Sequence, residues 1–300
     1  MLARWFVTAV AFAICIGSAT VGAQRPRPLS PLPAEGLGIA PFFDGWYENP
    51  DGSITFSFGY SNLSRDEVAE IPLGQDNFIT PKEYDGRQPT SFPPAIADSA
   101  EGAVRRPDNR RERERGVFTV TVPPTFKGDV VWTLRHRGQT FRVPARAKTS
   151  AYQLRWPMAA GSVPPLLRFS EKGQAGRGPV GVQADAVKAK VGAPITFSVF
   201  LTDDSVREKE PVQIKERDRG GKGGAINVTW YKHTGPGAVE FSPRKQSIPE
   251  LQGTVTTSAT FKEAGEYVVR VRADNFGRID TSPGNQCCWT NGYVKVTVAP

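Results

Sequence analysis

Two adjacent cysteines, Cys287 and Cys288, are the side chains of this sequence best suited to unusual chemistry. They follow the turn-forming residues 282–286 and precede Trp289 and Asn291, so we expect this candidate site on a loop entering the last strand. Neighbouring cysteines can join only in a strained ring, and strained disulfides are the more easily reduced ones.

Four interpretations of this pair stay open. They are a vicinal disulfide that shapes a ligand platform beside Trp289, a thiolate site for a soft metal, a bond to another chain, and two small, partly buried hydrophobic side chains. An oxidising compartment disfavours exposed free thiols, which makes the vicinal disulfide the leading prediction.

A second candidate contact lies in residues 105–115, which hold six arginines and three acids. The arginines are Arg105, Arg106, Arg110, Arg111, Arg113 and Arg115. The chain has a formal net charge of +8, which suits an anionic partner. No aromatic residues alternate with the arginines to stack on bases, so nucleic acid is not an expected partner. We expect a solvated loop that makes a secondary electrostatic contact, with a cell-surface glycan or another exported protein as partner.

Residues suited to catalysis are few. The two histidines, His136 and His233, are expected to be solvated turn residues, and neither lies near a nucleophile elbow or a cysteine in sequence. The acidic run 203–210 lacks the spacing of a calcium loop, and no phosphate-binding or dinucleotide-binding fingerprint occurs. We therefore expect no catalytic residue, no metal and no cofactor.

The first 23 residues are typical of a secretory signal peptide. Arg4 supplies a positive charge, residues 5–17 are uncharged and mostly apolar, and small residues lead to a cleavage site before Gln24. The apolar run is shorter than the roughly 20 residues of a membrane span, so we expect no span after cleavage. Residues 24–41 are rich in proline and predict an extended tether.

Residues 42–157 predict a first β-sandwich domain. Strands at 44–48 and 53–60 flank the turn 49–52, and the second strand alternates apolar with small polar side chains, as a half-buried strand does. Further strands are expected at 116–122, 129–134 and 139–143. The expected core residues of this domain are Trp46, Phe56, Phe58 and Trp132.

A proline- and glycine-rich linker at 158–181 leads to a second domain at 182–300. Its expected strands are 194–201, 225–232, 253–261, 266–273 and 293–298, and a charged, glycine-rich loop at 203–224 separates the first two. No stretch has a sustained helical period. The predicted fold class is therefore all-β, with two antiparallel β-sandwich domains.

Residues 227–232, 235–241, 257–261 and 264–273 follow one another in an order that resembles the immunoglobulin-like domains of the PKD kind in bacterial surface and secreted proteins. The resemblance covers residues 182–298. It implies that Trp230 is the core tryptophan and Tyr267 a corner tyrosine whose hydroxyl bonds nearby backbone. The cysteine pair of antibody domains is absent. Such sandwiches serve many purposes, so the resemblance implies no activity.

The runs 45–52, 56–60, 71–74 and 116–123, with segment 287–292, are similar to a group of secreted bacterial proteins of unknown function. The leading hypothesis is an exported, non-catalytic binding or surface-structural protein. One alternative is a glycan-active hydrolase with carboxylates in the cleft between the domains. Another is a thiol-based redox or copper-handling factor that uses Cys287 and Cys288.

Overall fold

The computed structural model describes residues 38–64, 67–94, 113–147, 149–154, 163–206, 226–275 and 288–300. The expected signal peptide, the greater part of the tether, Cys287 and most of the arginine-rich segment lie outside these residues. The described residues belong to one compact unit, Glu35–Pro300. Apart from the short 3-10 turns η1 (Lys82–Tyr84) and η2 (Ser150–Tyr152), the regular elements among them are strands, which confirms the all-β fold class.

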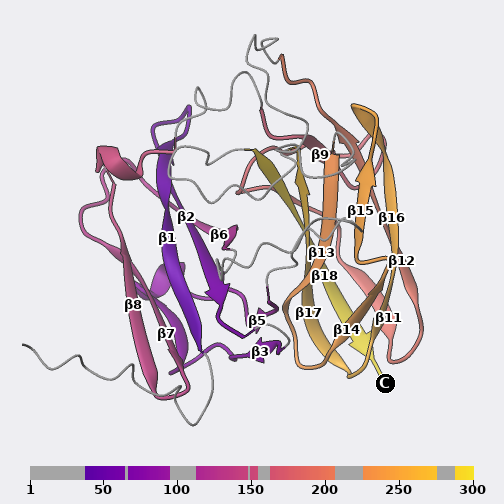
Figure 1. Cartoon of the computed structure of the whole chain (residues 1–300), viewed down its shortest axis with the longest axis horizontal. Helices are drawn as coiled ribbons and strands as arrows, with labels where there is room; N and C mark the ends of the chain where they lie inside the picture. Colours follow the sequence, from indigo (N-terminus) through magenta and orange to yellow (C-terminus); the bar gives the residue numbers. More distant parts are fainter. Residues whose placement is uncertain are drawn as a thin grey trace, which may run out of the picture. The chain divides into compact units, whose positions relative to one another are not determined.

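Buried apolar residues gather into two clusters, which we call the first core (within residues 39–145) and the second core (within residues 167–298). Two three-stranded sheets and a strand pair enclose the first core. The sheets are β1 (Ile39–Glu48), β2 (Ile54–Asn62) and β6 (Glu114–Val122), and β4 (Asn77–Thr80), β7 (Val130–His136) and β8 (Gln139–Ala145); the pair is β3 (Ala69–Glu70) and β5 (Ser91–Phe92). β1 lies beside β2 and also contacts β7 and β8 (Figure 1).

The hairpin of β1 and β2 forms at the predicted turn. Gly52 has a φ of 81°, a left-handed value that glycine adopts without strain, and its N–H donates to the carbonyl of Asn49 at 2.9 Å. Asp51 accepts hydrogen bonds from both the N–H and the hydroxyl of Ser53, which stabilises the turn.

β2 differs from the predicted half-buried strand because both of its faces are buried. Phe56 and Phe58 face the first core. On the opposite face, the Ser57 hydroxyl donates to Asp44, and the hydroxyls of Thr55 and Thr121 bond each other at 2.9 Å. The small polar residues of the alternation therefore lie in a second buried layer, and their polarity is satisfied by hydrogen bonds.

Aromatic rings fill the first core. Phe58 stacks on Phe118 with centroids 5.0 Å apart, and Trp132 meets Phe118 edge-on at the same distance. The indole N–H of Trp132 donates to Asn77 at 3.0 Å, so burial leaves no unpaired donor on this ring. All four residues expected in this core are buried: Trp46, Phe56, Phe58 and Trp132.

Two sheets enclose the second core. The larger one contains β10 (Val182–Gln183), β11 (Val187–Lys190), β18 (Trp289–Ala299), β17 (Gly265–Asp274), β13 (Ile226–Thr234) and β15 (Lys245–Ile248). The smaller one contains β14 (Val239–Ser242), β16 (Gln252–Phe261), β12 (Ile195–Thr202) and β9 (Leu166–Arg168). The pairing is mostly antiparallel, but β10 and β11 run parallel to β18. β18 starts at Trp289, four residues before the predicted start at Tyr293.

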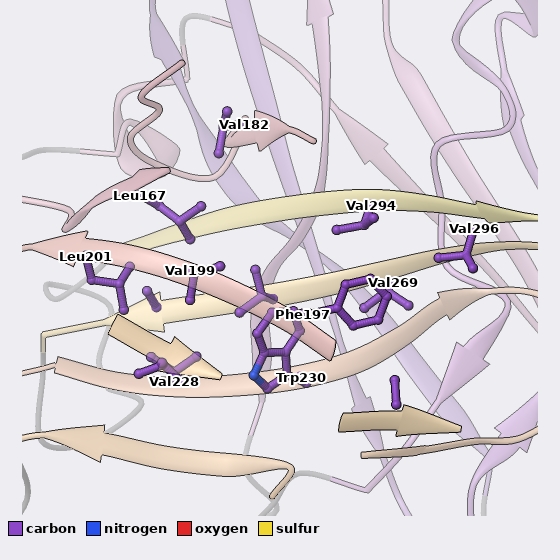
Figure 2. Packing of buried hydrophobic residues seen from close by; sticks show 14 of the residues in the cluster. Leu167, Val182, Phe197, Val199, Leu201, Val228, Trp230, Val269, Val294 and Val296 are labelled. Atoms are coloured by element: carbon purple, nitrogen blue, oxygen red, sulfur yellow. The ribbon is translucent and has the colours of Figure 1, made fainter. Parts of the chain in front are cut away.

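The second core has the interior that the immunoglobulin-like resemblance implied. Trp230 is fully buried and stacks on Phe197 with centroids 5.8 Å apart (Figure 2). Tyr267 is also buried, and its hydroxyl donates to the carbonyl of Glu263 at 2.8 Å and accepts from the N–H of Gly237 at 3.0 Å. Tyr267 therefore ties the start of β17 to the backbone of two earlier residues, Gly237 and Glu263, as a corner tyrosine does.

Candidate functional site

A buried carboxylate on β6 makes an ion pair with the second core. Glu114, the first residue of β6, is 1% exposed, and its Oε2 lies 2.9 Å from Nη1 of Arg272 on β17. The hydroxyl of Tyr231 on β13 donates to the same carboxylate, at 3.3 Å to Oε2. A buried charge is tolerated only where a partner and hydrogen bonds replace its water, and Glu114 has both.

The strand registers explain how these partners come to one face. Tyr231 pairs with Arg270 in the β13–β17 ladder, and Arg272 pairs with Asn291 in the β17–β18 ladder. The intervening residues, such as Trp230, point into the second core. By strand alternation, the polar set lies on the other face of the same sheet. The junction is our name for this set, which comprises Tyr231, Arg270, Arg272 and Asn291, together with Glu114 and Gly116 of β6.

Arginines surround Tyr231 within the junction. The guanidinium of Arg270 lies 4.3 Å from the ring centroid, and those of Arg244 and Arg272 lie at 5.4 Å and 6.0 Å. A desolvated cation over an aromatic face is attracted by about 2 kcal/mol. Arg270 is 1% exposed, and its Nη1 donates to Oδ1 of Asn291 at 3.4 Å.

Gly116 provides a close backbone contact within the junction. Its N–H donates to Oδ2 of Asp44 at 2.8 Å, and its carbonyl accepts from Nδ2 of Asn291 at 2.7 Å. Its φ of 56° is left-handed, and a Cβ at this position would overlap the indole ring of Trp289. Both the backbone conformation and the close approach therefore require glycine here.

Burial changes the acidity of the carboxyl groups near the junction. It raises the pKa of Asp44 from 3.8 to about 6, although the N–H of Gly116 and the positive charge of Arg115 offset part of the effect. Burial also raises the pKa of Asp274 to about 6, against the opposing attraction of Arg272, whose Nε lies 3.6 Å from Oδ2 of Asp274.

His233 makes a second contact between the cores. Its Nε2 lies 2.9 Å from the carbonyl oxygen of Arg87, and its own carbonyl accepts from the N–H of Thr90 at 2.8 Å. The neighbouring Lys232 extends to Glu70 of β3, with Nζ and Oε1 3.0 Å apart. His233 is 5% exposed, so the expectation of a solvated turn residue is wrong.

The predicted cysteine site is buried where it is described. Cys288 is 1% exposed and disulfide-bonded, and the other two cysteines of the chain lie outside the described residues. Trp289 and Asn291 belong to β18 and are 8% and 0% exposed, because they cover Gly116. The vicinal disulfide and the ligand platform stay predictions.

The arginine segment is only partly described. Arg105, Arg106, Arg110 and Arg111 lie outside the described residues. Arg113 is exposed, with its guanidinium 4.6 Å from the ring centroid of Phe42. Arg115 is part of β6 and 6% exposed, so it does not lie in a solvated loop. The predicted loop therefore ends before residue 114.

The sequence analysis assigned no site role to Glu114, and it predicted no functional role for Tyr231, Arg270 or Arg272. Charged residues at alternate positions of a strand are typical of a solvent-facing sheet surface, and residues 270–274 have this pattern. Glu114 of the covering strand, β6, is 158 positions away from Arg272 in sequence, so no local signal connects the two.

Neither a cluster of metal-ligand side chains nor a long apolar helix occurs among the described residues. Among them, no three His, Cys, Asp or Glu side chains are grouped so that they could hold a metal ion. The same part of the chain contains no helix with the length and apolarity needed to cross a membrane.

Comparisons with known proteins give only distant structural likenesses. No protein-family model matches the chain, and no curated protein matches it in sequence. Solved structures with some likeness include domains 4 and 5 of the S-layer protein SbsC (17% identity over 60% of this chain and 69% of that chain, TM-score 0.23). Another is the D00-D0 domain of intimin, with 11% identity over 87% of this chain and 100% of that chain and a TM-score of 0.25. A third is the titin Ig tandem A164-A165, with 9% identity over 88% of this chain and 99% of that chain and a TM-score of 0.20. At such identities and TM-scores, these likenesses carry no argument about function.

Proposed function

We propose that this protein is an exported, non-catalytic binding or surface-structural protein whose two β-sandwich cores work as one rigid module. The observation that carries the proposal is the ion pair between Glu114 and Arg272, with Tyr231 as a third partner. Side chains that could do acid–base chemistry are used there to hold one core against the other. A module that keeps two sandwiches in fixed relation suits load bearing or the presentation of a binding surface.

The partner is an anionic cell-surface glycan or another exported protein. The support is the net charge of +8, together with the exposed Arg113 at the end of the arginine-rich segment. The signal peptide predicted at residues 1–23 supports export.

A hydrolysis assay tests the non-catalytic part of the proposal. The exported protein and its Glu114→Gln variant are incubated with a panel of surface polysaccharides, and both binding and released reducing ends are measured. We expect binding that weakens with added salt, and no reducing ends above the blank for either protein. Reducing ends that the wild type releases above the blank would contradict the non-catalytic part of the proposal and favour a glycan hydrolase.

Intact-mass spectrometry of the exported protein tests the export and cysteine predictions. The mature chain should begin at Gln24, and it should gain two hydrogens on reduction if Cys287 and Cys288 form the vicinal disulfide. A mass that includes residues 1–23 contradicts export with cleavage, and two freely alkylated thiols contradict the disulfide.

A further inference from the structure

His233 is held to the first core by both its ring and its backbone. Arg87 offers a carbonyl oxygen, which can only accept, so Nε2 carries the proton in the hydrogen bond of 2.9 Å. The carbonyl of His233 accepts from the N–H of Thr90 at 2.8 Å. One residue of β13 therefore makes both of these hydrogen bonds to the segment between η1 and β5.

That segment is firmly attached on its other side. The side-chain amide of Asn77 on β4 donates to the carbonyl of Pro89 at 2.7 Å, and the N–H of Ile71 donates to the carbonyl of Thr90 at 2.8 Å. Residues 87–90 are thus attached to elements around the first core. If a contact in this region opens, it opens between these residues and β13.

The surroundings of the His233 ring disfavour a second proton. Nδ1 is buried and has no hydrogen-bond partner among the described residues. The ring of Tyr293 on β18 meets the imidazole edge-on at 5.6 Å, and the nearby charge is the guanidinium of Arg270 on β17. Lys232, the adjacent charged residue, directs Nζ to Glu70 and to the carbonyl of Gly237. A proton on Nδ1 would leave a buried donor without an acceptor, close to another cation.

These surroundings set the direction of the pH effect. Burial, with the charge of Arg270 second, lowers the pKa of His233 from 6.5 to about 4. In an open state the ring is solvated and takes up a proton near pH 6.5. As pH falls, the open state therefore binds this proton at a higher pH than the closed state does. The closed contact is at full strength above pH 6.5, and its stability is lost as pH falls toward 4.

We propose that His233 makes the contact between β13 and residues 87–90 an acid-sensitive latch, which releases Thr90 when the imidazole takes up a proton. Asp44 and Asp274 titrate in the same range with the opposite effect, because burial raises the pKa of each to about 6. The pH dependence of wild-type stability therefore mixes opposing contributions. The contribution of the latch is isolated by comparing the wild type with a variant at the same pH.

Residue-resolved hydrogen exchange of the Thr90 amide tests the latch. Wild type and His233→Gln are compared at pH 4.5 and at pH 7.5, so that intrinsic exchange rates cancel within each pH. From pKa values of 6.5 and about 4, the wild type should open roughly 80-fold more at pH 4.5 than a non-titrating latch would. The matched control is His136→Gln, which replaces the chain's other histidine and should exchange like the wild type.

Three results would overturn the latch. In the first, the Thr90 amide loses the same amount of protection between pH 7.5 and pH 4.5 in the wild type and in His233→Gln. In the second, amides throughout β2 and β12 lose protection as much as Thr90 does, which means global unfolding rather than local release. The third is an NMR titration of the wild-type ring with a midpoint of 6 or higher. This titration decides the matter if His233→Gln does not fold: a midpoint below 5 that coincides with the loss of Thr90 protection supports the latch.

Discussion

Glu114 provides the negative charge that pairs with Arg272 in the junction. Removing its charge leaves the buried Arg272 with only the more distant carboxylate of Asp274, 3.6 Å away, so we expect Glu114→Gln to lower the free energy of unfolding by about 3 kcal/mol. The control is Asp129→Asn, which breaks an exposed pair with Arg146 and should leave stability unchanged within error. Urea unfolding at pH 7.5 measures both variants.

The double variant Glu114→Leu with Arg272→Met sharpens this prediction. It removes both charges together, and apolar replacements of a buried pair are often tolerated. We expect a smaller loss of stability than in Glu114→Gln alone, which is a strongly non-additive result. A larger loss would mean that Glu114 contributes by packing and not by its charge.

Asp44 gives a pH-dependent prediction. Its folded pKa of about 6 lies above its ordinary value of 3.8, so the folded state binds the extra proton. The stability from this group is complete below pH 3.8 and is lost as pH rises through 6, by roughly 3 kcal/mol in all. Asp44→Asn should remove that loss, as measured by urea unfolding between pH 4 and 8.

A matched variant separates burial from charge at this site. Asp51→Asn changes an exposed carboxylate whose pKa is lowered by its bonds to Ser53, so it should follow the wild type between pH 4 and 6. An Asp44→Asn profile parallel to that of the wild type would show that the ionised carboxylate carries no burial penalty.

At the scale of residues, the sequence predicts core positions better than buried polar ones. Trp132 and Trp230 are large and apolar in strand-like surroundings, and both are completely buried. Arg115 and His233 carry local signals of a loop or a turn, yet they are buried by strands distant in sequence. Burial of a polar side chain depends on tertiary partners, which a local pattern does not contain.

At the scale of elements, β6 and β18 meet through Gly116. We expect Gly116→Ala to lower the free energy of unfolding by roughly 2 kcal/mol more than Gly192→Ala does, because an added Cβ would overlap Trp289 in the first variant only. Gly192 has a similar left-handed φ of 74°, with nothing within 4 Å of an added Cβ, so it controls for backbone strain. Thermal unfolding of the two variants gives the comparison, and equal losses would exclude close packing of Trp289 on Gly116.

The long strands follow closely from local sequence, whereas short ones such as β4, β14 and β15 lie outside the predicted strands, and β9 falls within the predicted linker. The β1–β2 hairpin forms around its predicted turn, because Pro50 fixes its own φ and Gly52 adopts the left-handed φ that the turn needs. The start of β18 could not be predicted, since Trp289 and Thr290 extend the strand by pairing with Asp274 and Ala273 of β17. Pairing with a distant strand sets such a boundary.

At the scale of the whole molecule, the described strands enclose two cores within one compact unit. The resemblance to immunoglobulin-like domains predicted the interior of the second core and said nothing of the junction. Sandwich folds serve many functions, so function has to be argued from particular contacts. Here those contacts are Glu114 with Arg272 and Tyr231, Gly116 with Asn291, and His233 with residues 87–90.

The most direct test of the account is whether the two cores unfold together. Urea titration followed by NMR gives separate midpoints for amides of β2 in the first core and β12 in the second. We predict one shared midpoint in the wild type and two midpoints in Glu114→Gln, because that variant weakens the contact between cores more than either core itself. Two well-separated midpoints in the wild type would contradict the claim that the junction joins the cores into one module.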